Sequence, residues 1–165
     1  MDHLIIARPG EPSSTASRLT WNGYDQAFRL AQVLRQQFRP EQVDRILTCS
    51  MPGAIATAHI VAAAFSGTPP KKQKRIEERL ELGISDKTNY QRFMYLLRGL
   101  HALHKGVVVV VADNHYTNRE SPVDFLKTVV GSPQPKPSGG QLYRVLLPGQ
   151  AWHIYCKEGL YHRIP

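Results

Sequence analysis

Short apolar runs alternate with longer amphipathic segments along this chain, a pattern that predicts an α/β domain with helices on both faces of a sheet. We expect the first strand at His3–Ala7 and further strands at about residues 43–48 and 75–80. Val107–Val111 is a run of five valines, as expected for a central strand that is buried on both faces.

Four helices are expected between these strands. Thr20 is a plausible N-cap for a helix whose apolar residues recur at helical spacing until Pro40 ends it. An alanine-rich helix is predicted at residues 54–65, and another at 119–130. Between them, one further helix is indicated by an apolar stripe of core type, formed by Tyr90, Phe93, Met94, Leu97 and Leu100.

The last third of the chain has a different pattern. Residues 131–140 are rich in Gly, Pro and Ser and are not expected to form regular structure. The runs at 141–147 and 151–156 flank Pro148-Gly149-Gln150 and predict a hairpin, followed by a short C-terminal tail. Since 165 residues suffice for one core, we interpret the whole chain, 1–165, as a single domain.

Composition indicates a soluble globular chain, with 42% apolar and 21% charged residues. The longest apolar run, Val107–Ala112, is far shorter than a membrane span, and the first residues lack the features of a secretory signal. We therefore expect a cytoplasmic protein. Cys49 and Cys156 lack metal-binding spacing and are predicted to be buried free thiols.

The formal net charge of +8 favours contact with anions. Its densest cluster, Lys71–Arg75, follows two prolines and contains no aromatic residue that would stack on a base. A solvated loop is the favoured interpretation of this cluster, and an RNA or acidic-protein site is the weaker one.

Several short motifs follow these elements in order. An apolar strand leads directly into Arg8, Gly10 and Glu11. The other motifs are Leu19-Thr20-x-x-Gly23-x-x-Gln26-Ala27, then Cys49–Ala58 matched through Ala54, Thr57 and Ala58, then Leu80–Gly83, and lastly Val111-Ala112-Asp113. Together they resemble the histidine phosphatase superfamily, the phosphoglycerate mutase-like proteins, which open with Arg-His-Gly-Glu. The resemblance implies a three-layer α/β/α sandwich with a mostly parallel central sheet and a C-terminal antiparallel hairpin. In length the chain resembles the small phosphohistidine phosphatases.

In the family, a first histidine attacks phosphorus, two arginines and a second histidine hold the phosphoryl oxygens, and an acid protonates the leaving group. On the matched register, Pro9 replaces the nucleophile, Gly53 the second arginine and Asp113 the second histidine. Arg8 is retained. Glu81 is the candidate acid, although Glu78 competes with it.

These replacements predict a catalytically degenerate protein, a pseudophosphatase that binds a protein partner or a small ligand. A carboxylate at Asp113 repels a phosphate dianion, and two unit charges about 4 Å apart interact by roughly 4 kcal/mol at an effective dielectric constant near 20. We also expect Asp113 to form an ion pair with Arg8 in the old phosphate position. The alternative is a phosphatase or other hydrolase with a rearranged site that uses Arg8, Glu81, Asp113 and His115.

His115 is the candidate replacement nucleophile or base for such an enzyme, although an ordinary loop histidine is the favoured interpretation. Asp113, His115 and Glu81 lack the spacing of a metal site, and neither a metal nor a cofactor is expected.

Overall fold

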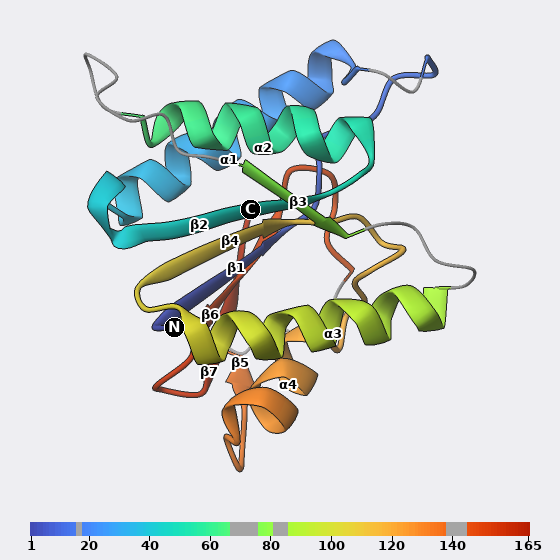
Figure 1. The fold of residues 1–165 in the computed structure, drawn as a ribbon. Coiled ribbons are helices and arrows are strands. Elements are labelled where there is room, and N and C mark those ends of the chain that lie inside the picture. Colours follow the sequence, from blue (N-terminus) through green and yellow to red (C-terminus); the bar gives the residue numbers. More distant parts are fainter. Residues whose placement is uncertain (16–17, 67–75, 81–85, 138–144) are drawn as a thin grey trace.

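The computed structural model describes residues 1–15, 18–66, 76–80, 86–137 and 145–165. A central sheet of seven strands runs through it in the order β3-β2-β4-β1-β6-β7-β5. Helices α1 and α2 cover one face of this sheet, and α3 and α4 cover the other (Figure 1). The predicted three-layer fold is therefore confirmed.

The elements follow the predicted alternation closely. The strands are β1 (His3–Ala7), β2 (Val43–Cys49), β3 (Ile76–Leu80), β4 (Val107–Val111), β5 (Lys136–Pro137), β6 (Ala151–Tyr155) and β7 (Leu160–Ile164). The helices are α1 (Trp21–Gln37), α2 (Pro52–Ala64), α3 (Asp86–Leu103) and α4 (Ser121–Phe125), with a 3-10 turn η1 (Pro40–Gln42) and a π-helical turn η2 (Leu126–Val130).

Strands β1 and β4 lie at the centre of the sheet and run parallel, with Ala7 opposite Val111. Every valine of β4 is buried, as are residues 4–7 of β1. In a strand that is buried on both faces, apolar residues are favoured at every position and do not alternate with polar ones. This explains the continuous apolar runs. The two free thiols, Cys49 and Cys156, are also buried, as predicted.

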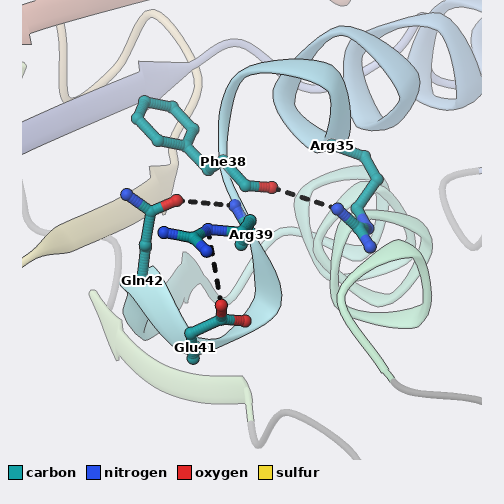
Figure 2. Close-up of polar contacts among 5 residues, drawn as sticks. All are labelled: Arg35, Phe38, Arg39, Glu41 and Gln42. Carbon is teal, nitrogen blue, oxygen red and sulfur yellow. Dashed lines mark hydrogen bonds and ion pairs between the residues drawn. The ribbon is translucent and has the colours of Figure 1, made fainter.

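Helix α1 begins at the predicted cap and ends in a compact polar turn. The Thr20 hydroxyl accepts a hydrogen bond from the Gly23 amide. After the helix, the Arg39 amide donates to the Gln42 side-chain carbonyl at 2.8 Å, and the Arg39 guanidinium lies 3.4 Å from the Glu41 carboxylate (Figure 2). Because these contacts pair polar groups just beyond the helix, they stabilise the turn that leads into β2.

The predicted C-terminal hairpin is present, but it has different strands. β6 pairs antiparallel with β7, whereas residues 145–147 are not in a strand. The expected tail therefore forms β7, because Gly159 adopts φ +67° and reverses the chain. The prediction of no regular structure at 131–140 was also wrong in part, since Lys136 and Pro137 pair with β7.

The helix predicted at 119–130 is present as α4 and η2. It begins at Ser121 and changes to π-helical hydrogen bonding from Leu126 onward. Gly131 then ends it in the left-handed conformation. Within the described residues, no helix is long and apolar enough to cross a membrane.

Candidate functional site

The candidate site lies where β1 and β4 end side by side. Both strands are parallel, so the residues that follow them emerge at the same edge of the sheet. The Ala112 amide donates to the Ala7 carbonyl at 2.9 Å, which holds the two strand ends together. Arg8 and Asp113 are thus placed at one edge, as ligand-binding residues often are in α/β sheets.

Arg8 is fixed by backbone contacts to the segment before β6. One guanidinium nitrogen donates to the Leu146 carbonyl at 2.5 Å, and the Arg8 amide donates to the Gln150 carbonyl at 2.9 Å. Burial lowers the pKa of Arg8, while the negative charge of Asp113 raises it. The retained arginine therefore holds a connection in place as well as carrying positive charge.

Arg8 and Asp113 do not form the expected ion pair. Among the described residues, the ion pairs within 4 Å join other side chains. Both groups have backbone partners instead. The Leu146 carbonyl accepts from Arg8, and the Asp113 carboxylate accepts from the His115 amide at 2.9 Å. The two charges still interact electrostatically across the site.

Pro9 occupies a buried position at the site. Its carbonyl accepts from the Gly149 amide at 3.1 Å. Gly149 has φ +77°, and a Cβ there would lie 2.5 Å from the Gln26 Cβ, so only glycine fits this contact. The proline ring therefore lies within a tightly packed junction and offers no nucleophilic atom.

The residues around Pro9 explain why the motif that contains Thr20 persists. The Glu11 carboxylate accepts a hydrogen bond from the Thr20 hydroxyl at 2.8 Å, and the Glu11 amide donates to the Gln26 side chain at 2.9 Å. The Gly10 amide donates to the Thr57 hydroxyl at 3.1 Å. These motif residues join β1, α1 and α2, so they have a structural role that does not require catalysis.

Gly53 lies in the first turn of α2 and is buried. A Cβ there would meet the Leu19 side chain at 3.4 Å and the Pro12 side chain at 3.8 Å. Its carbonyl accepts from the Thr57 hydroxyl at 2.9 Å. The surroundings of this position are thus mainly apolar, and glycine contributes no positive charge to the site.

Two further groups lie near this edge: Tyr116, which was not singled out from the sequence, and Cys49, which was predicted only as a buried free thiol. Tyr116 is fully buried, and burial raises the pKa of its hydroxyl to about 12. A side-chain hydrogen bond with Ser50 and the charge of Arg92 lower this pKa and offset part of the rise. Burial also raises the pKa of the Cys49 thiol to about 11. Both groups are neutral near pH 7, so Cys49 is a poor nucleophile. Position after a strand was the only signal for Tyr116.

The other candidates are distributed as follows. His115 is exposed, in the loop after β4. Glu81 and the Lys71–Arg75 cluster lie outside the described residues. Glu78 belongs to β3, with its backbone in register with Thr48 of β2. The described part of the chain contains no group of three or more potential metal ligands.

Neither a known family profile nor a curated protein sequence matches the chain. Solved structures do resemble it. A candidate alpha-ribazole-5'-P phosphatase from Escherichia coli K-12 has 14% identity and a TM-score of 0.63, with 98% of this chain and 94% of that one covered. A phosphoserine phosphatase from Entamoeba histolytica has 17% identity and a TM-score of 0.56, with coverage of 93% and 90%.

A mycobacterial glucosyl-3-phosphoglycerate phosphatase is similar in the same way. It has 15% identity and a TM-score of 0.57, with 93% of this chain and 92% of that one covered. The class of fold that these likenesses define is an α/β/α sandwich. More particularly, the fold is the one that the resemblance of the motifs to the histidine phosphatase superfamily predicted.

Proposed function

We propose that this chain is a pseudophosphatase, which has kept the histidine phosphatase fold and acts by binding a protein partner or a small ligand. The observation that carries the proposal is Pro9, which is buried after β1 and is bonded through its carbonyl to Gly149. Covalent phosphoryl transfer requires a side-chain nucleophile, and proline has none.

The charges around Pro9 support the same proposal. Phosphoryl transfer depends on groups that stabilise anionic oxygens. Gly53 contributes no charge, Asp113 contributes a negative one, and one guanidinium nitrogen of Arg8 already donates to Leu146. A phosphate dianion at this edge would therefore be attracted by Arg8, which already donates one hydrogen bond to Leu146, and repelled by the Asp113 carboxylate.

The test is an activity assay on the purified protein with p-nitrophenyl phosphate and a phosphohistidine peptide. We expect turnover at the buffer background, and the same result for His115→Ala. Turnover above background that Arg8→Ala and His115→Ala both abolish would overturn the proposal. Because these two substitutions lie in the candidate site, such a loss would separate intrinsic activity from a contaminating phosphatase.

An active phosphatase with a rearranged site is the second candidate. The similarity to structures that bear phosphatase names favours it, as does the retained Arg8. In this version Arg8 binds phosphate, Glu81 or Asp113 acts as the acid, and His115 is the nucleophile or base. A covalent phosphohistidine at residue 115, trapped with substrate and located by mass spectrometry, would establish the active phosphatase and exclude the pseudophosphatase.

We also propose that the protein works in the cytoplasm. Both cysteines are free and buried, which is compatible with a reducing compartment. Fractionation of cells that express the tagged full chain tests this location, and recovery in a secreted or membrane fraction would contradict it.

A further inference from the structure

The outer surface of α3 carries two large apolar side chains that the fold does not cover. Tyr95 is 79% exposed and Leu103 is 80% exposed. They stand four residues before and four residues after Gly99, so all three positions follow one row along the helix. Two uncovered apolar side chains in one row form a short stripe on the outer side of this layer.

Gly99 leaves a notch in the middle of that stripe. A Cβ atom at this position would have no other heavy atom within 4 Å, so packing inside the chain does not require glycine. Glycine is also less favourable than alanine inside a helix. The fold thus gains nothing visible from Gly99, whereas a missing side chain between Tyr95 and Leu103 opens space for a side chain from another molecule.

Basic side chains flank the stripe. From Asp86, the first residue of α3, to Lys105 the sequence contains four Lys or Arg residues, and Asp86 is the one acid. These four are exposed: Lys87, Arg92, Arg98 and Lys105. Among the described residues, none of the four belongs to an ion pair within 4 Å. The surface therefore combines an apolar centre with a cationic rim.

The outer side of α1 provides a contrast. Trp21 is 92% exposed and Phe28 is 55% exposed, but Asp25 and Arg29 form an ion pair beside them. The apolar residues of α1 therefore have charges of both signs nearby. Among the helices that the structure describes, α3 alone combines large exposed apolar side chains, a glycine with open space around it and several basic residues against the single acid Asp86.

We propose that this face of α3 docks an acidic amphipathic helix of a protein partner. An apolar side chain of that helix enters the notch at Gly99 between Tyr95 and Leu103, in the way that ridges of one helix pack into grooves of another. Its flanking carboxylates pair with the basic rim, chiefly Arg92 and Arg98. The inference rests on the proposed function, binding to a protein partner, and names the chemistry of that partner.

Other occupants match the surface less well. A second copy that docked through the same face would bring two sets of four cations together, which is repulsive. RNA would satisfy the basic residues but has no apolar side chain for the notch. An anionic membrane needs a broader apolar surface than Tyr95 and Leu103 provide. Each of these occupants is a distinct outcome of the test below.

The probe is a synthetic acidic helical peptide with one leucine stripe and glutamates on both flanks, labelled for fluorescence anisotropy. A scrambled peptide of identical composition has no stripe and serves as its control. We expect the full-length protein to bind the first peptide and not the second. Amide NMR shifts should localise the contact to α3, including Gly99, and added salt should weaken it.

Matched variants test each part of the surface. Gly99→Leu fills the notch and should weaken peptide binding about tenfold, and Tyr95→Ala or Arg98→Glu should also weaken it, by the several-fold to tenfold loss usual for central interface residues. Trp21→Ala and Arg29→Ala, on the opposite layer, are the controls and should leave affinity unchanged. Circular dichroism of each variant confirms that the fold is retained.

Several results would overturn the proposal. These are no binding of the striped peptide, equal binding of the scrambled one, or no effect of Gly99→Leu in a folded protein. Binding of a single-stranded RNA or of phosphatidylserine vesicles that Arg98→Glu abolishes, without peptide binding, would assign the surface to that ligand instead. Dimerisation that Gly99→Leu abolishes would assign it to a second copy. The phosphatase assay is independent, so failure of the proposed function is recognised separately.

Discussion

Gly10 and Gly23 pack backbone against backbone where the loop after β1 meets the first turn of α1. A Cβ atom on Gly10 would lie 2.2 Å from the Gly23 carbonyl oxygen, and a Cβ atom on Gly23 would lie 2.2 Å from the Glu11 carbonyl oxygen. No side chain can move to relieve either contact, because the obstructing atoms belong to the backbone. This close approach brings the candidate site and α1 together.

Gly23→Ala should therefore destabilise the protein, by about 2–4 kcal/mol, as expected when a packed backbone is forced apart. Gly99→Ala is the matched control, since it makes the same change in another helix with open space around the Cβ. The control should stabilise by about 1 kcal/mol through helix propensity. Urea unfolding measures both, and a shift of the same sign in the two variants would contradict this account.

This contact also shows what could be predicted from the sequence. The motif with Leu19, Thr20, Gly23 and Gln26 indicated the start of a helix within a known fold. In the structure Thr20 caps that helix, Gln26 accepts a hydrogen bond from the Glu11 amide, and Gly23 packs against the backbone of Glu11. The strands and helices were predictable because apolar periodicity and caps act locally. The fold was therefore largely determined by signals that span a few residues each.

The candidate site was less predictable, because its contacts join distant segments through backbone atoms. The Leu146 carbonyl, which accepts from Arg8, is 138 residues further along the chain, and a carbonyl has no sequence signature. The expected pair between Arg8 and Asp113 failed for this reason. Strand β7 was missed because Gly159 reverses the chain within a segment that resembled a tail.

Replacing Arg8 should affect stability whatever its role in binding. Arg8→Ala removes a charge-assisted hydrogen bond to Leu146, which is 4% exposed. We expect a loss of about 1–3 kcal/mol in the free energy of unfolding, the usual range for such a bond. Arg29→Ala, which replaces an exposed arginine that forms an ion pair with Asp25, is the control and should change stability by less than about 1 kcal/mol. Equal losses in chemical denaturation would show that the Leu146 contact contributes nothing.

A histidine cluster on β1, β6 and β7 predicts a pH dependence. His153 is 3% exposed, its Nε2 lies 3.1 Å from Nδ1 of His3, and its ring centroid lies 5.0 Å from that of His162. Burial, followed by the charges of His162 and His3, lowers the pKa of His153 to about 3. The neutral imidazole is thus the form that the folded protein accommodates.

The sign of the effect follows from this depressed pKa. The unfolded chain takes up a proton on His153 near pH 6.5, whereas the folded protein does so only near pH 3. Stability is therefore fully present above about pH 6.5 and is lost as the pH falls toward 3. At pH 5 the loss from this residue alone is about 2 kcal/mol, from 1.36 kcal/mol per pH unit.

His153→Phe removes that proton and keeps an aromatic ring beside Tyr155. The difference in unfolding free energy between pH 7 and pH 5 should shrink by about 2 kcal/mol relative to the unsubstituted protein. His59→Phe, at an exposed position on α2, is the control and should leave the difference unchanged. An unaltered pH dependence in His153→Phe would mean that this histidine is readily protonated in the folded state.

Restoring the nucleophile alone should not restore catalysis. In Pro9→His the new imidazole would lie at the end of β1, but Gly53 would still contribute no cation and Asp113 would still repel the phosphate dianion. Activity toward p-nitrophenyl phosphate should stay at background.

Asp113→Asn removes the negative charge and should strengthen binding of vanadate to the Pro9→His variant by about tenfold or more, as loss of a nearby repulsive charge predicts. Titration by calorimetry measures this gain, with Asp25→Asn as an exposed control. Robust turnover by Pro9→His alone would show that the anion-binding groups of the site are intact and that the electrostatic argument is wrong.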